Sequence, residues 1–209
     1  MLTTTDRPPR NGKSLIQFRE SDQLTRIELP AHAGLSRLAQ VIDSVMKEGS
    51  RAAVRRACAE FLNAAAAFYG VRAPEVRALD ARPRRVREGG WETELFGDYS
   101  LHNARIRIWT RTAVRKQVTS VGTFLSTLCH EFCHHLDCQK LGFPRSPHTR
   151  GFYERAALLY HHARGTPVKK LFWIEMPGGR WRIDWRRTNA VQQTADRIMH
   201  FSSRSYSGT

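Results

Sequence analysis

Residues 120–141 constrain the fold of this chain more than any other segment. The apolar side chains there recur at the spacing of one helix face, at Leu125, Leu128, Cys129, Phe132 and Leu136. Gly142 and Pro144 follow and are expected to end the helix. The same segment contains the pentapeptide His130-Glu131-Phe132-Cys133-His134. Because the apolar stripe centres on the opposite side, the helix is predicted to separate a packed face from a polar one.

The spacing of the two histidines in this pentapeptide has a chemical meaning. Positions i and i+4 lie about 40° apart around a helix, so His130 and His134 can reach one metal ion from the same face. Glu131 is adjacent to His130 and is placed to hold a metal-bound water rather than the metal itself. The H-E-x-x-H pattern therefore predicts a zinc site on this helix.

A catalytic zinc site needs a third protein ligand and one open position for water. His148 is the preferred third ligand, since it follows His134 across a loop rich in glycine and proline and stands at the start of the next predicted helix. Glu154 is the alternative and would give a site of two histidines and one glutamate. More than one helical turn separates His148 from Glu154, so we expect only one of them to bind the metal. Asp137 is either an acceptor for the N–H of a ligand histidine or a surface carboxylate.

The remaining sequence predicts an α+β fold, with a small mixed or antiparallel sheet packed on helices. Apolar spacing predicts further helices over residues 35–48, 51–69, 150–163 and 188–200. Strand-like composition appears over residues 91–99 and 105–109, with a turn between them. Pro177-Gly178-Gly179 indicates a hairpin that joins residues 171–176 to residues 180–185.

Three parts of the chain differ in character. Residues 1–30 are polar, contain two adjacent prolines and are expected to form a weakly ordered N-terminal arm. Residues 31–165 hold the helices, the sheet and the zinc motif, and form the main domain. Residues 166–209 are predicted to form a basic hairpin and helix packed on that domain.

The charge balance favours a polyanionic partner. Lys and Arg number 34 against 19 Asp and Glu, a formal net charge of +15. Such an excess attracts nucleic acid through non-specific phosphate contacts, and nothing in the sequence indicates base-specific recognition. The third of three basic clusters is interleaved with aromatic residues, most of which are expected to face the core rather than a nucleic acid. It comprises Lys169, Lys170, Arg180, Arg182, Arg186 and Arg187.

Three further features concern the compartment. No apolar run approaches the roughly 20 residues that span a bilayer. The first residues lack the apolar core of a secretory signal. Three of the four cysteines fall between Cys129 and Cys138, which is poor spacing for a disulfide framework. We therefore expect a cytoplasmic protein, with access to the nucleoid and without a membrane partner.

The zinc motif and the segment after it resemble those of a known family. The H-E-x-x-H motif followed by His148-Thr149-Arg150-Gly151-Phe152 resembles the SprT-like zinc metallopeptidases, the Spartan-related zincins. Their usual third motif is H-G-x-x-F, so His148 and Phe152 match in register while Thr149 stands where glycine is expected. Residues 95–99 and 105–108 are similar to the glycine-turn-strand segment that precedes the metal helix in this family. The resemblance covers roughly residues 35–165.

The resemblance implies a site and a mechanism. Zn²⁺ bound by His130, His134 and His148 would activate water, and Glu131 would act as the catalytic base. Residues 105–109 would form the edge strand that pairs with an extended protein substrate. Tyr153 and His135 are candidates for stabilising the oxyanion.

The expected activity is that of an endopeptidase acting on proteins associated with DNA. The alternatives are a nucleic-acid-binding protein with a structural or inactive zinc site, a zinc hydrolase of a non-peptide bond, and a site-specific protease of a regulatory repressor. A broad open groove favours a protein substrate, whereas a closed pocket favours a small one.

Overall fold

The structure is a computed structural model that describes residues 3–30, 32–86 and 92–190. Its helices are α1 (Gly12–Gln23), α2 (His32–Glu48), α3 (Arg51–Tyr69), α4 (Val121–Gln139) and α5 (Arg150–Arg164). Its strands are β1 (Glu75–Ala81), β2 (Arg84–Val86), β3 (Glu92–Glu94), β4 (Gly97–Ser100), β5 (Arg105–Arg111), β6 (Trp173–Met176) and β7 (Arg180–Ile183). The α+β class predicted from the sequence is confirmed.

The helix boundaries follow local capping signals. Ser50 caps the start of α3 by accepting a hydrogen bond from the Ala53 amide, and Gly70 ends that helix in the left-handed conformation. Residues 185–190 are helical, and the rest of the last predicted helix lies outside the described residues. Within the described ranges, no helix is long and apolar enough to cross a membrane.

The central sheet has three strands in the order β1-β5-β4. β5 pairs in parallel with β1 and antiparallel with β4. The expectation that residues 105–109 form an edge strand is therefore wrong, because β5 has a hydrogen-bonded neighbour on both sides. β4 is the edge strand next to it. The strand expected over residues 91–99 is divided into β3, which pairs with β2, and β4, while Trp91 lies outside the described residues.

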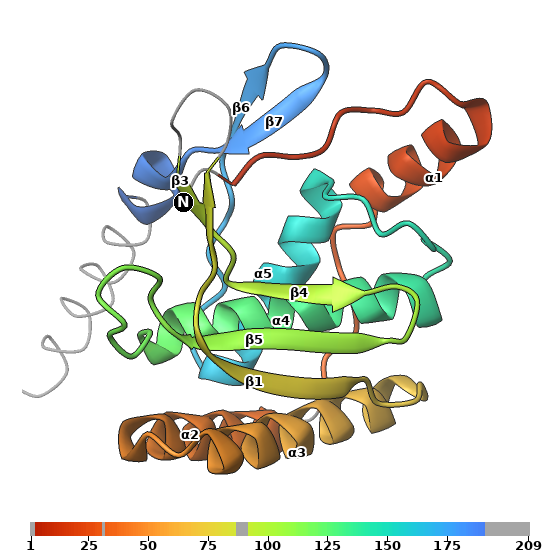
Figure 1. Cartoon of the computed structure of the whole chain (residues 1–209). Coiled ribbons are helices and arrows are strands. Elements are labelled where there is room, and N and C mark those ends of the chain that lie inside the picture. The colour runs from red at the N-terminus through yellow and green to blue at the C-terminus, as the bar shows by residue number, and fades with distance from the viewer. Residues whose placement is uncertain (1–2, 31, 87–91, 191–209) are drawn as a thin grey trace, which may run out of the picture.

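Helices α3 and α4 pack against this sheet (Figure 1). Side chains alternate along β5, so Ile106 and Ile108 are buried in the core while Arg107 is exposed between them. α4 packs against β4 and β5, and α3 packs against β1 and α2. The apolar stripe predicted on α4 is confirmed, since all of its members are buried in this core: Leu125, Leu128, Cys129, Phe132 and Leu136.

The N-terminal segment differs from the weakly ordered arm expected over residues 1–30. Residues 12–23 form α1, and the preceding segment runs along the C-terminal hairpin (Figure 1). The Thr5 amide donates to the Trp181 carbonyl at 2.7 Å, and the Ile183 amide donates to the Thr3 carbonyl at 3.0 Å. Residues 3–5 therefore lie antiparallel beside β7, with Thr4 opposite Arg182. These partners are far apart in the sequence, which is why local composition does not reveal them.

Candidate metal centre

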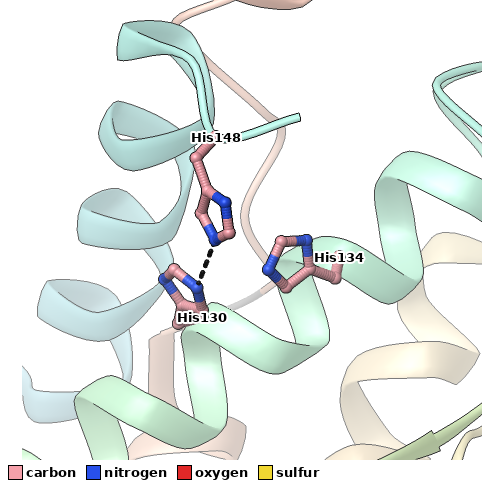
Figure 2. A group of neighbouring side chains, drawn as sticks. All are labelled: His130, His134 and His148. Carbon is pink, nitrogen blue, oxygen red and sulfur yellow. Dashed lines mark hydrogen bonds between the residues drawn. The ribbon is translucent and has the colours of Figure 1, made fainter. Parts of the chain in front are cut away.

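Three histidine side chains point toward one another (Figure 2). His130 and His134 project from α4, and His148 projects from the loop that precedes α5. One ring nitrogen from each lies within 4.8 Å of the others, and Nε2 of His130 is 3.1 Å from Nε2 of His148. Two nitrogen ligands of a tetrahedral zinc ion are about 3.3 Å apart when each bond is about 2.0–2.1 Å. The closest pair therefore has the spacing of two ligands of one ion, and the three rings together could hold a single metal ion.

His130 and His134 are held in the neutral form that can bind a metal ion. Burial, with a smaller contribution from His148, lowers the pKa of His130 to about 3. Burial and the two neighbouring rings also hold the pKa of His134 well below its ordinary value. Both side chains are consequently neutral at pH 7, which is the form that donates a lone pair to a metal.

Phe152 forms an apolar floor under the cluster. Its ring centroid lies 4.9 Å from that of His130, 4.4 Å from that of His134 and 5.1 Å from that of His148. Phe152 is fully buried, so it restricts the tilt of all three rings. The sequence identifies this phenylalanine as a motif position, and the structure gives it a physical role.

The start of α5 explains the residues around the third histidine. Thr149 caps the helix by accepting a hydrogen bond from the Phe152 amide at 3.0 Å, and its Oγ1 lies 3.0 Å from the hydroxyl of Ser21. Gly151 lies against α1, where an added Cβ would be 2.1 Å from the Ser21 carbonyl oxygen. Thr149 therefore has a capping role at the position where the resemblance predicts glycine, and a glycine is required two residues later.

Glu131 lies between α4 and the edge strand β4. It is 5% exposed, and a Cβ added to Gly97 would lie only 3.0 Å from its Oε1. Burial, followed by the negative charge of Asp98, raises the pKa of Glu131 to about 8. Gly97 thus allows the strand to approach the carboxyl group, and the raised pKa means that this group readily holds a proton near neutral pH.

A series of hydrogen bonds holds the Nδ1 side of the His134 ring. The Ser146 hydroxyl donates to Asp137 Oδ2 at 2.9 Å and lies 2.7 Å from Nδ1 of His134. Because its proton is given to the carboxylate, the hydroxyl accepts from the Nδ1–H of His134 and leaves Nε2 of that ring free. Asp137 Oδ1 accepts from Arg155 at 2.8 Å, and both of these side chains are fully buried.

These hydrogen bonds correct the role expected for Asp137. The carboxylate supports a histidine of the cluster, but it does so through Ser146 rather than by direct contact. Sequence reasoning missed Ser146 and Arg155 as parts of the site. Both are polar residues without a motif, and only the position of Asp137 gave a signal that a polar network exists there.

The other predicted site residues lie around the cluster and have partners of their own. Glu154 is not part of the histidine cluster, and its Oε1 accepts a hydrogen bond from Trp173 Nε1 at 3.3 Å. His135 is almost fully buried, with Nε2 2.8 Å from the Arg72 carbonyl and Nδ1 3.1 Å from the Tyr99 hydroxyl. Both of its ring nitrogens are occupied, so His135 is poorly placed to stabilise an oxyanion.

Tyr153 lies closer to the cluster than the other oxyanion candidate. Its ring centroid is 5.7 Å from that of His148 and 5.9 Å from that of His130. Its hydroxyl donates to the Thr4 carbonyl at 3.2 Å. Tyr153 therefore ties the N-terminal segment to the edge of the cluster.

The basic residues fall into two kinds of environment. On the sheet, Arg105 and Arg111 form ion pairs with acidic residues of β1, and Arg107 pairs with Asp98. At the hairpin, Arg187 and Lys170 lie over the ring of Phe172 at 4.2 and 5.5 Å. Trp185 nearby is 42% exposed. Cationic groups and accessible aromatic rings thus occur together around the C-terminal hairpin.

Comparisons with protein-family models, with curated proteins and with solved structures found nothing that matches this chain.

Proposed function

We propose that this chain is a zinc-dependent endopeptidase of the SprT-like type, with a zincin fold, that acts on proteins associated with nucleic acid. The observation that carries the proposal is the convergence of three imidazoles beside a buried carboxylate. The order along the chain adds support, because a strand, the H-E-x-x-H helix and the third histidine follow one another as the family resemblance implies.

Each side chain of the proposed centre has a separate role. His130, His134 and His148 hold the ion, with Nε2 of His130 and His148 facing each other at 3.1 Å. When bound, a zinc ion supplies positive charge that acidifies water and polarises a carbonyl group. Glu131 accepts the proton of the attacking water and delivers it to the leaving amine. The Phe152 floor and the Ser146 hydroxyl keep the rings in place.

The edge strand β4 is the proposed site for the substrate backbone. An extended peptide adds to a sheet through main-chain hydrogen bonds, which requires a strand with a free edge. β4 pairs with β5 along one edge and packs against α4. Gly97 brings this strand against Glu131, so a peptide on β4 passes close to the proposed base.

The hairpin is the proposed contact with nucleic acid. The net charge of +15 and the cationic groups over aromatic rings suit a phosphate backbone and unstacked bases. Binding of this kind is non-specific in sequence and weakens as salt rises. It brings protein substrates that are bound to nucleic acid, in the cytoplasm or the nucleoid, to the proposed centre.

The decisive experiment compares two glutamates of the chain. Glu131→Gln keeps the shape of the side chain but removes the base, so peptidase activity should fall by about 10²- to 10⁴-fold while bound zinc is retained. Glu154→Gln is the matched control, since that carboxylate contacts Trp173 outside the cluster, and it should stay near the activity of the wild type. Metal content and cleavage of DNA-bound and free protein substrates are measured for both.

Two results would overturn the proposal. Full activity in Glu131→Gln would reject this residue as the base, and a wild-type protein that takes up no zinc would reject the metal centre. A faster rate on DNA-bound than on free substrate is expected from the basic hairpin.

The hairpin also favours a second candidate, a nucleic-acid-binding protein in which zinc is structural or inactive. Lys170, Phe172 and Arg187 lie just outside the two strands of the hairpin and are not part of the histidine cluster. DNA binding that is equal with and without metal, together with no proteolysis, would select this candidate. Cleavage confined to one site of a repressor would instead select the regulatory protease.

A further inference from the structure

We infer that Asp6, in the N-terminal segment of residues 3–6 that lies beside β7, positions His148 in the metal centre. The inference rests on the proposed binding of metal by the three histidines. It goes further by assigning a role to a segment that lies outside the motif and outside the helices that carry it.

Asp6 forms two hydrogen bonds with the backbone of His148. The Asp6 amide donates to the His148 carbonyl at 2.8 Å, and the His148 amide donates to Asp6 Oδ2 at 2.8 Å. His148 precedes α5 and therefore has no helical hydrogen bonds of its own to fix it. These reciprocal bonds supply the missing restraint on the backbone that carries the third imidazole.

The same carboxylate also faces the imidazole ring. Asp6 Oδ2 lies 3.5 Å from Nδ1 of His148, while Nε2 of that ring faces His130. A carboxylate on the far nitrogen of a histidine is the usual outer partner in metal sites, because it fixes the tautomer and the ring orientation. Asp6 thus orients the nitrogen that points into the cluster.

The hairpin determines where Asp6 lies. Thr5 donates its amide to the Trp181 carbonyl, and its Oγ1 accepts from the Trp181 amide at 2.8 Å. The next contact is made by Tyr153, whose hydroxyl donates to the Thr4 carbonyl. Because β7 holds this strand, a change in the hairpin reaches His148 through Asp6.

The first test measures zinc affinity, by competition with a chromophoric chelator, in the full chain. Asp6→Ala should weaken zinc binding by about 10- to 100-fold, which is the usual effect of losing an outer partner. Asp6→Asn should weaken it less, since the amide oxygen can still accept from the His148 backbone. Asp43→Asn is the matched control, because that carboxylate pairs with Lys47 on the surface of α2, and the variant should bind zinc like the wild type.

The second test moves the strand without altering Asp6. Thr5→Pro removes both the amide that donates to the Trp181 carbonyl and the hydroxyl that accepts from the Trp181 amide, and it should weaken zinc binding as well. Thr4→Pro is its control. Thr4 lies opposite Arg182 at a position of the antiparallel pair whose amide makes no hydrogen bond across it, so the three hydrogen bonds that Thr3 and Thr5 make with β7 remain. Absorption of the Co²⁺-loaded protein reports the ligand geometry in each variant.

The outcomes separate the two proposals. If the wild type binds no zinc, the metal centre itself is rejected. If the wild type binds zinc and both Asp6→Ala and Thr5→Pro bind it equally well, only the role of the strand is rejected. Circular dichroism in the presence of chelator identifies a variant that has unfolded, in which case the other variant decides.

Discussion

The two faces of α4 are stabilised in different ways. On one face, Leu125, Leu128 and Phe132 are fully buried in a single apolar cluster with α2, α3 and the sheet. On the other face, His130 and His134 depend on particular atoms of residues elsewhere in the chain. Apolar contacts are non-directional, whereas polar contacts in a buried place need a partner at a set distance. The apolar face can therefore tolerate small shifts that the polar face cannot.

The largest expected effect is on the polar face, at the buried ion pair. Arg155→Met leaves Asp137 buried without its cation, which should lower the free energy of unfolding by about 3–5 kcal/mol. Zinc affinity should fall with it, because Asp137 orients Ser146 and Ser146 contacts His134. Urea denaturation in the presence of chelator and zinc competition measure the two effects.

A double variant tests the cause of that loss. Arg155→Met combined with Asp137→Leu removes both charges and should recover part of the stability, although not the zinc affinity. An Arg155→Met variant as stable as the wild type would show that Asp137 does not need its cation in the folded protein.

The next effect is on the apolar face. Leu128→Ala removes a fully buried side chain and should lower the free energy of unfolding by about 2–5 kcal/mol through the cavity it leaves. Zinc affinity should remain that of the wild type, since the polar contacts are untouched. A loss of zinc affinity at a temperature where the variant is fully folded would contradict the separation of the faces.

The smallest effect is expected at the cap of α5. Thr149→Ala should lower the free energy of unfolding by about 1 kcal/mol, because it removes the acceptor for the Phe152 amide. Thr149→Ser keeps the hydroxyl and is the control. Thermal unfolding followed by circular dichroism compares them, and an alanine variant as stable as the serine variant would mean that the cap contributes nothing.

The sequence predicts those parts of the molecule that depend on local periodicity. The α4 stripe and the boundaries of α3 follow from spacing and from residues with strong end preferences. The convergence of His130 and His134 follows from helix geometry alone. The approach of His148 is expected because a loop and a following helix return the chain to α4.

Other features depend on partners that are distant in the sequence. Apolar and basic side chains alternate along β5, which predicts one buried and one solvent-exposed face. The alternation does not predict that β1 pairs with β5 in parallel along the edge opposite β4. Arg155 is an arginine on a helix and would be expected in solvent, but it is fully buried with Asp137. The strand at Thr3–Asp6 has no periodic signal, because only a short stretch of backbone and two side chains hold it to β7 and His148. Such contacts are chosen by tertiary geometry, not by local preference.

The pairing of Thr5 with Trp181 has a consequence for the order of assembly. The two residues are separated by 176 positions, so this contact closes almost the whole chain into one loop. A nascent polypeptide that has emerged only as far as α5 already possesses all three imidazoles and their phenylalanine floor. It lacks β7, which holds the segment that carries Asp6, so the contact of Asp6 with His148 is completed only after β7 has been made and not with the helix that bears the motif.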